Sequence, residues 1–259
     1  MLPRWGVLLA VLTLTAGLGL TASSASAATT GFTLGGPIHL VGANRAVQGG
    51  ISHQAGSTNW SGYAATTGPY TSVSASWTQP AGTCSLGAQQ AAFWVGLDGY
   101  SSSSVEQTGS EVDCVGSTAH YFAWYEMYPN ASVTYSNTVR PGDHFNASVT
   151  FTGTSTFSLD IADTTQGWSH TTVASLAGAA RSSAEVIVEA PCCTAGGGIL
   201  PLTNFGTVNM AGSTANGSAL GNAGGMTQIT MIDNTGLDKD TVSSLNGGED
   251  FSATWLGSN

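Results

Sequence analysis

The sequence predicts an all-β protein, built as an antiparallel sandwich of two sheets. Its central and C-terminal parts consist of short runs rich in Val, Thr, Tyr, Phe and Trp, separated by Gly, Pro, Asn and Asp. Such runs at short spacing are typical of sandwiches and barrels. No segment of helical length has convincing 3.6-residue periodicity, so helices are not expected as major elements.

Alternation within single runs supports this prediction. In His144–Phe151, the residues Phe145, Ala147, Val149 and Phe151 fall on one face, and polar residues fall on the other. A strand with one face in a core shows this pattern. The strands expected in this way are 73–78, 91–97, 120–128, 144–151, 156–162, 184–189, 206–210, 227–232 and 251–255. A short helical turn is considered near 172–176, and 211–225 is expected to be a long loop.

The N-terminal residues differ from the rest of the chain. Residues 1–27 have a basic Arg4, an apolar run of about 14 residues and an Ala-Ser-Ala end, which indicates a secretory signal peptide rather than a membrane anchor. Residues 28–58 are Gly-rich and carry no acidic group. They are interpreted as a pro-segment or flexible arm, or alternatively as a segment with an ordinary first strand at 38–41. Residues 59–259 are expected to form the sandwich domain.

The charge distribution limits the classes of binding partner that are expected for this domain. All 15 acidic residues lie from position 59 onward, where only Arg140, Arg181 and Lys239 oppose them. Nucleic acid and anionic membranes are therefore not expected partners.

Cysteines occupy positions 84, 114, 192 and 193, and an oxidising compartment favours disulfides. One pairing is 84–114 with 192–193, but the sequence does not choose among the three pairings. No metal is expected, because the histidines lack ligand spacing relative to the cysteines.

Polar residues inside aromatic or aliphatic strands are the candidates for chemistry. Alternation places Glu126 on one face with Phe122, Trp124 and Tyr128, either as a paired core acid or as a cleft residue. It places Glu185, Ile187 and Glu189 on the face opposite Val186 and Val188. Gln107 is followed two residues later by Gly109, where a backbone or substrate can approach closely. The zinc-protease, serine-hydrolase and aspartic-protease motifs are absent from the sequence.

Six segments in order resemble one family. They are Asn-Trp-Ser-Gly-Tyr at 59–63, Phe-Trp-Val-Gly-Leu-Asp-Gly at 93–99, Glu-Gln-Thr-Gly at 106–109, Ala-Trp-Tyr-Glu-Met-Tyr-Pro at 123–129, Ala-Glu-Val-Ile-Val-Glu at 184–189 and Asn-Phe-Gly at 204–206. Together they are similar to the glutamic peptidases, also called eqolisins, which were first known as pepstatin-insensitive acid proteases. The resemblance covers about residues 59–255 and is that of a secreted, bacterial-type member.

The resemblance implies two bent seven-stranded antiparallel sheets of the concanavalin A-like or jelly-roll type. It implies an endopeptidase that cleaves polypeptides at acid pH, secreted and monomeric, with no cofactor. The family's catalytic glutamine falls on Gln107 and its catalytic glutamate on Glu185. Hydrogen bonds to Glu185 are expected to keep it partly ionised at low pH. Substrate binding is expected from Asn59, Trp60, Gly62, Trp94, Asp98, Gly99, Glu126 and Tyr128.

The sequence departs from the family pattern in two places. Val186 stands where a Trp is usual, on the face opposite the chemistry, and Ala-Pro-Cys-Cys at 190–193 replaces an acidic and aromatic continuation. Two rival readings remain. A glycoside hydrolase would use Glu126 with Glu185 or Glu189 as its two carboxylates and would leave Gln107 without a part. A non-catalytic carbohydrate-binding sandwich would need neither Gln107 nor Glu185.

Overall fold

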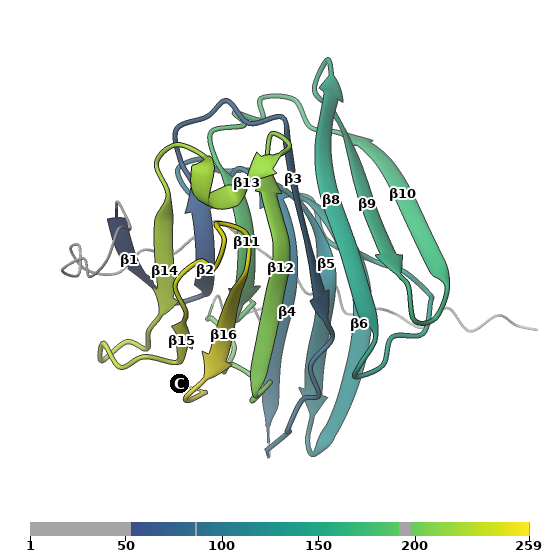
Figure 1. Ribbon diagram of the computed structural model, residues 1–259. Helices are drawn as coiled ribbons and strands as arrows, with labels where there is room; N and C mark the ends of the chain where they lie inside the picture. The colour runs from purple at the N-terminus through teal and green to yellow at the C-terminus, as the bar shows by residue number, and fades with distance from the viewer. Residues whose placement is uncertain (1–52, 86, 192–197, 259) are drawn as a thin grey trace, which may run out of the picture. The chain divides into compact units, whose positions relative to one another are not determined.

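The computed structural model describes residues 53–85, 87–191 and 198–258. Over these ranges it consists of strands in two sheets and one short 3-10 helix, η1 (Leu220–Asn222), which confirms the all-β prediction (Figure 1). The first sheet contains β1 (His53–Ser57), β2 (Trp60–Ala65), β4 (Ala88–Leu97), β5 (Val105–Val115), β6 (Thr118–Tyr128), β7 (Val133–Thr134), β11 (Ala184–Glu189) and β14 (Thr227–Met231). The second contains β3 (Ser72–Thr78), β8 (His144–Gly153), β9 (Thr156–Asp163), β10 (Trp168–Ser175), β12 (Thr207–Ala215), β13 (Ser218–Ala219), β15 (Asp240–Val242) and β16 (Phe251–Trp255).

The sheets are almost entirely antiparallel. The strand order is β1-β14-β2-β11-β4-β5-β6-β7 in the first sheet and β10-β9-β8-β3-β12-β16-β15 in the second, where β13 pairs with β12. Only the pair β1–β14 is parallel among the described strands. Each sheet has eight strands, one more than the resemblance implied. The first sheet gains β1, which lies in the segment that the sequence separated from the domain.

The core lies between the two sheets and follows from alternation. Val186 and Val188 of β11 pack there with inward residues of β3, β8 and β9, such as Trp77, Phe145 and Leu159. A second buried cluster covers the other face of the first sheet. It consists of Trp60, Ala64, Ala92, Trp94, Val105, Trp124, Ile187 and Ile229. The first sheet therefore buries both of its faces, which explains the continuous burial of β2 and β11.

One local prediction was wrong, and one possibility that the sequence left open is not found. Residues 172–176, considered for a helical turn, lie mostly in β10, because Thr172 and its neighbours pair along β9. Residues 211–215, expected in a loop, continue β12 beyond a bulge between Ala211 and Thr214. Gly212 in that bulge has a φ of +58°, so the glycine signal marked an irregular strand rather than its end. The strand considered at 38–41 lies outside the described residues.

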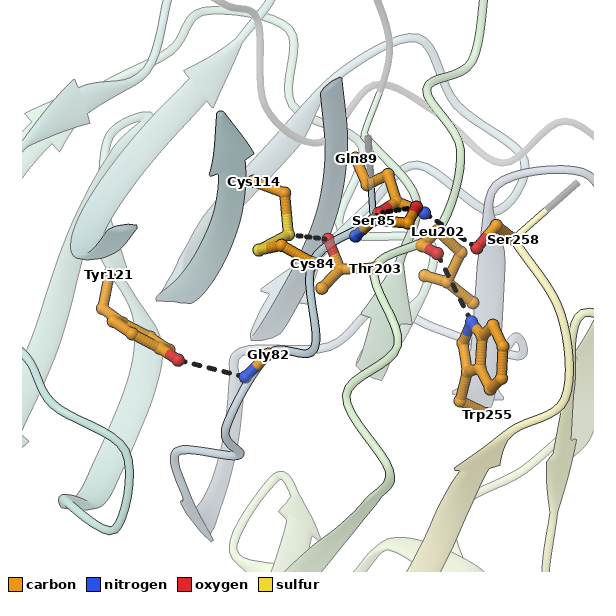
Figure 2. Close-up of a disulfide and its surroundings, with 10 residues drawn as sticks. All are labelled: Gly82, Cys84, Ser85, Gln89, Cys114, Tyr121, Leu202, Thr203, Trp255 and Ser258. Atoms are coloured by element: carbon orange, nitrogen blue, oxygen red, sulfur yellow. Dashed lines mark hydrogen bonds between the residues drawn. A yellow bond between two sulfur atoms is a disulfide. The ribbon is translucent and has the colours of Figure 1, made fainter. Parts of the chain in front are cut away.

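A disulfide joins Cys84 to Cys114 and so ties the segment before β4 to the end of β5 (Figure 2). This was one of the pairings that the sequence allowed, whereas Cys192 and Cys193 lie outside the described residues. Around it, the backbone N–H of Gly82 donates to the hydroxyl of Tyr121 at 3.0 Å, and the Thr203 hydroxyl lies 3.7 Å from the Cys114 sulfur. The bridge thus holds an irregular segment against the sheet.

We expect the double variant Cys84→Ser/Cys114→Ser to lose about 3 to 4 kcal/mol of unfolding free energy, because the bridge closes a loop of 30 residues. Urea unfolding of the variant and of the parent protein, at one acid pH, measures this loss. An unchanged unfolding midpoint would show that the bridge does not constrain the unfolded chain.

Candidate functional site

Four residues form one row across neighbouring strands of the first sheet. Glu185 of β11 is directly opposite Gly96 of β4, Gly96 is opposite Gln107 of β5, and Gln107 is opposite Glu126 of β6. Residues directly opposite one another project to the same face of a sheet. That face is the one turned away from the inter-sheet core, because Val186 and Val188 occupy the core face. Residues far apart in the sequence are thereby brought into one line.

The two predicted catalytic residues lie on either side of Gly96. Glu185 and Gln107 are two strand spacings apart, or roughly 9 to 10 Å between Cα atoms. The residue between them, Gly96, has no side chain. At this point of the row β4 therefore places no side chain between the two polar groups, and the Trp94 ring lies 2.8 Å from where a methyl group on Gly96 would be.

Gln107 is held in place by Glu126. Its amide Nε2 donates a hydrogen bond of 2.8 Å to Oε2 of Glu126, and both side chains are fully buried. Burial, and then the nearby carboxyl of Glu189, raise the pKa of Glu126 to about 9. Glu126 is therefore a neutral acid at low pH, and its carbonyl oxygen still accepts one of the two amide hydrogens.

Glu185 is also fully buried, and burial raises its pKa well above the ordinary value for a glutamate. The hydroxyl of Ser183 lowers that pKa in part, while the nearby acids Asp98 and Glu106 raise it further. Neither carboxyl oxygen has a hydrogen-bond partner within 3.5 Å among the described residues. The expectation that hydrogen bonds keep Glu185 ionised at low pH was wrong. Burial has the largest effect and outweighs the influence of the nearby Ser183 hydroxyl, so the pKa of Glu185 is raised and the protonated form predominates in acid.

A further glutamate, Glu189, is the anchor for the aromatic residues of the site. It accepts a hydrogen bond of 2.9 Å from the Trp94 indole and one of 3.4 Å from the Asn59 amide. Burial raises its pKa to about 8. The Trp60 ring meets the Trp94 ring edge to face, with centroids 4.9 Å apart. Asn59, Trp60 and Trp94 are thus gathered on the face that carries Glu185.

Asp98 and the glycines at 62 and 99 have clear structural roles. The Asp98 carboxylate accepts from the backbone N–H groups of Arg181 and Ser182 at 2.6 and 2.8 Å, which holds the entry to β11 and thus Glu185. A methyl group on Gly62 would lie 2.3 Å from the Val186 carbonyl oxygen, so β2 approaches β11 closely there. A methyl on Gly99 would meet Val105 and Trp60. Tyr128 packs beside the same cluster, opposite Val105.

Two further acids lie on the same face and were not identified from the sequence. Glu111 and Asp113 follow Gln107 in β5 at period two and therefore share its face. Burial, and then the charge of Asp113, raise the pKa of Glu111 well above its usual range. Burial raises the pKa of Asp113 to about 7. The signal that could have found them was the alternation Gln-x-Gly-x-Glu-x-Asp along 107–113.

The described residues contain no group of three or more His, Cys, Asp or Glu side chains arranged to hold a metal ion. The polar groups of the site are therefore carboxyl, amide and indole groups. Within the same residues there is no helix of the length and apolarity that a membrane span needs.

Comparisons with known proteins agree on one family. The sequence profile of the Peptidase A4 family matches residues 58–255. Aspergillopepsin-2 of Aspergillus niger is 27% identical over 220 residues, which cover 75% of this chain and 77% of that protein. Scytalido-glutamic peptidase, solved with a transition state analog inhibitor, has a similar fold, with a TM-score of 0.66 and 24% identity over 77% of this chain and 98% of that one. Aspergilloglutamic peptidase from Aspergillus niger has a TM-score of 0.57 and 26% identity, over 64% of this chain and 99% of that one.

Proposed function

Because this chain belongs to the Peptidase A4 family and is a glutamic-type endopeptidase, we propose that Glu185 and Gln107 are its catalytic pair. The observation that carries this proposal is the row in which Glu185 and Gln107 flank the bare position Gly96 on one face of the sheet. Two polar side chains of different chemistry thereby lie two strands apart on the same face of the sheet. A base and a hydrogen-bond donor that act on one carbonyl group must be held near each other in this way.

The proposed reaction uses Glu185 as base and then as acid. Its carboxylate takes a proton from a water molecule, whose oxygen forms a bond to the carbonyl carbon of the substrate. The electron pair of the C=O bond moves to the oxygen, and the side-chain amide of Gln107 donates a hydrogen bond that stabilises the negative charge that develops there. Glu185 then gives its proton to the amide nitrogen, the C–N bond breaks, and a carboxylic acid and an amine leave.

The raised pKa of Glu185 shapes this reaction. At acid pH only the ionised fraction of Glu185 molecules acts as base, whereas the proton that the leaving amine requires is readily available. The hydrogen bond from Gln107 to Glu126 supports the role of the amide, because it holds the Gln107 side chain in a fixed position on the face that carries Glu185. The neutral state of Glu126 in acid keeps a further negative charge away from the oxyanion.

The rival glycoside hydrolase fits the row poorly. Glu185 and Glu126 lie three strand spacings apart, about 14 Å between Cα atoms. Gln107 also stands between the two acids, where a two-carboxylate mechanism has no use for it.

We propose that the substrates are polypeptides. We also propose that the protein is secreted, because residues 1–27 resemble a signal peptide and the protein contains a disulfide.

The test is a digestion of denatured casein by the secreted protein at about pH 4, with pepstatin present and cut sites mapped by mass spectrometry. We expect internal cleavage that pepstatin does not reduce. A panel of β-glucans and chitin is incubated in parallel. Folded protein that leaves casein intact, or that releases sugars, would contradict the proposal.

A further inference from the structure

Lys239 is the only lysine of the chain, and it is buried. It lies in the connection between β14 and β15 (Figure 1), and only 4% of its surface is exposed. A lysine is almost never buried to this extent unless it is paired, because taking an ammonium group out of water is costly. The environment of Lys239 should therefore contain a group that compensates its charge.

The described residues do not supply that group. Among them, the Lys239 ammonium has no hydrogen bond and no ion pair. The nearby Asp240 carboxyl is turned toward the Ser61 hydroxyl, with which it forms a short hydrogen bond. The other nearby acid, Asp233, accepts hydrogen bonds within its own turn, from the backbone N–H and the hydroxyl of Thr235. Lys239 is thus a buried cation without a direct partner.

The charges nearby leave this cation uncompensated in acid. Burial lowers the pKa of Lys239 to about 8, and the charges of Asp240 and Asp233 offset this effect only in part. Burial raises the pKa of Asp240 to about 7. At acid pH the Lys239 side chain is therefore a charged ammonium, whereas Asp240 beside it is neutral.

Lys239 lines a cavity of about 650 Å³ at the end of β14. This volume is in the range of sites that bind small molecules. Asp233 is the one acid in the wall of the cavity. The wall otherwise combines apolar with hydroxyl-bearing side chains, among them Ile199, Leu200, Ile232, Thr58 and Ser258. A ligand in this cavity would meet one ammonium group and an aliphatic surface.

The cavity is separate from the row of Glu185 and Gln107. Thr58 lies just before β2, whereas Glu185 is opposite Ala64 near the other end of that strand. This stretch of strand is about 20 Å long. A small ligand in the cavity therefore does not contact the proposed catalytic pair, and the inference below does not depend on that pair.

We propose that this cavity binds an organic carboxylate with an apolar body, and that the ammonium group of Lys239 holds the carboxylate. A carboxylate supplies the opposite charge and the acceptor oxygens that the three ammonium hydrogens lack. The aliphatic part of the wall receives the apolar body. A free carboxylic acid and the C-terminus of a peptide that ends in an apolar residue share this chemistry.

The first test uses the fact that the chain has a single lysine. Protein that carries isotope-labelled lysine gives one lysine side-chain signal in NMR spectra. We expect N-acetyl-leucine to shift this signal saturably at about pH 5, where carboxylates are ionised. N-acetyl-leucinamide, which has the same body without the charge, should not shift it. Equal shifts with the acid and the amide, or no shift with the acid, would overturn the inference.

Hexanoate, added in the same experiment, distinguishes the two sources of the ligand. A saturable shift with hexanoate as well as with N-acetyl-leucine supports a site for apolar carboxylates in general. A shift with N-acetyl-leucine alone supports a site for the C-terminus of a peptide.

The second test replaces the cation. Lys239→Met keeps an unbranched apolar side chain and removes a buried charge, so we expect it to fold and to melt no lower than the parent. Calorimetric titration with N-acetyl-leucine should show binding at least about 10-fold weaker than in the parent. The control Arg140→Met removes the same charge at an exposed position and should bind as the parent does. Parent affinity in Lys239→Met would overturn the inference, and the comparison of acid and amide tests it in the parent protein without any variant.

Discussion

Replacing Glu185 by glutamine is expected to abolish proteolysis while the fold is retained. The amide has nearly the shape of the acid but cannot take a proton from water or return it to the leaving nitrogen, which removes a contribution of roughly 100- to 10,000-fold. Since Glu185 is fully buried and mostly protonated in acid, the neutral amide costs the folded state little. We expect kcat to fall at least 100-fold in casein cleavage at pH 4, with an unchanged melting temperature.

Gln107→Ala is the partner experiment. Loss of the proposed hydrogen-bond donor to the oxyanion is expected to lower kcat about 100- to 1000-fold. It also leaves Glu126 without its amide partner, so melting curves are recorded for both variants. The control is Gln166→Ala, a glutamine of the loop between β9 and β10, far along the sequence from the row. If either Glu185→Gln or Gln107→Ala cleaves casein at the parent rate, the catalytic assignment fails.

The second large effect is on stability, which is expected to fall steeply as the pH rises toward neutrality. Burial is the main cause that raises the pKa of five carboxyls, to about 8 for Glu106, about 7 for Asp113, about 9 for Glu126, about 8 for Glu189 and about 7 for Asp240. In the unfolded chain these groups ionise near pH 4. Between that pH and pH 7 to 9, the folded protein therefore binds more protons than the unfolded chain does.

This difference in bound protons means that the unfolding free energy falls as the pH rises. The stabilisation is fully present below about pH 4 and is lost as the pH rises through 7 to 9. Each group that stays protonated only in the folded state lowers the unfolding free energy by about 1.4 kcal/mol per pH unit. If two of the five behave in this way, the change from pH 4 to pH 7 costs about 8 kcal/mol. That loss is comparable with the whole stability of a typical domain, and it would lower the melting temperature by roughly 15 to 30 °C.

Thermal melts between pH 3 and pH 8 measure this dependence. Glu106→Gln removes one buried acid that faces the inter-sheet core and is not part of the row, so it should flatten the dependence and raise the melting temperature at pH 7 relative to the parent. The exposed Glu249→Gln serves as a control that leaves the dependence unchanged. A melting temperature that is constant from pH 4 to pH 7 would contradict the prediction.

Local patterns were sufficient to predict the strands that alternate strongly. The bounds of β11 and β16 agree with the predicted 184–189 and 251–255, and Val186 and Val188 face the core as alternation required. Strands whose residues are small or polar were missed, such as β1 and β10, because pairing with a neighbouring strand and not their own composition stabilises them. The order of short motifs indicated the family and matched Gln107 and Glu185 to its catalytic pair, but it gave no information on the distance between these two residues.

By itself, then, the sequence determined the all-β class, the faces of single strands and the identity of the two polar residues, because side-chain direction alternates within a strand whatever surrounds it. Only the tertiary structure decided that Glu185, Gly96 and Gln107 share one row, since the register of three strands distant in sequence depends on how both sheets pack. It also decided the protonation of the site. Burial is a property of the assembled sheets, and it raises the pKa values of Glu185 and Glu126 in a way that no motif records.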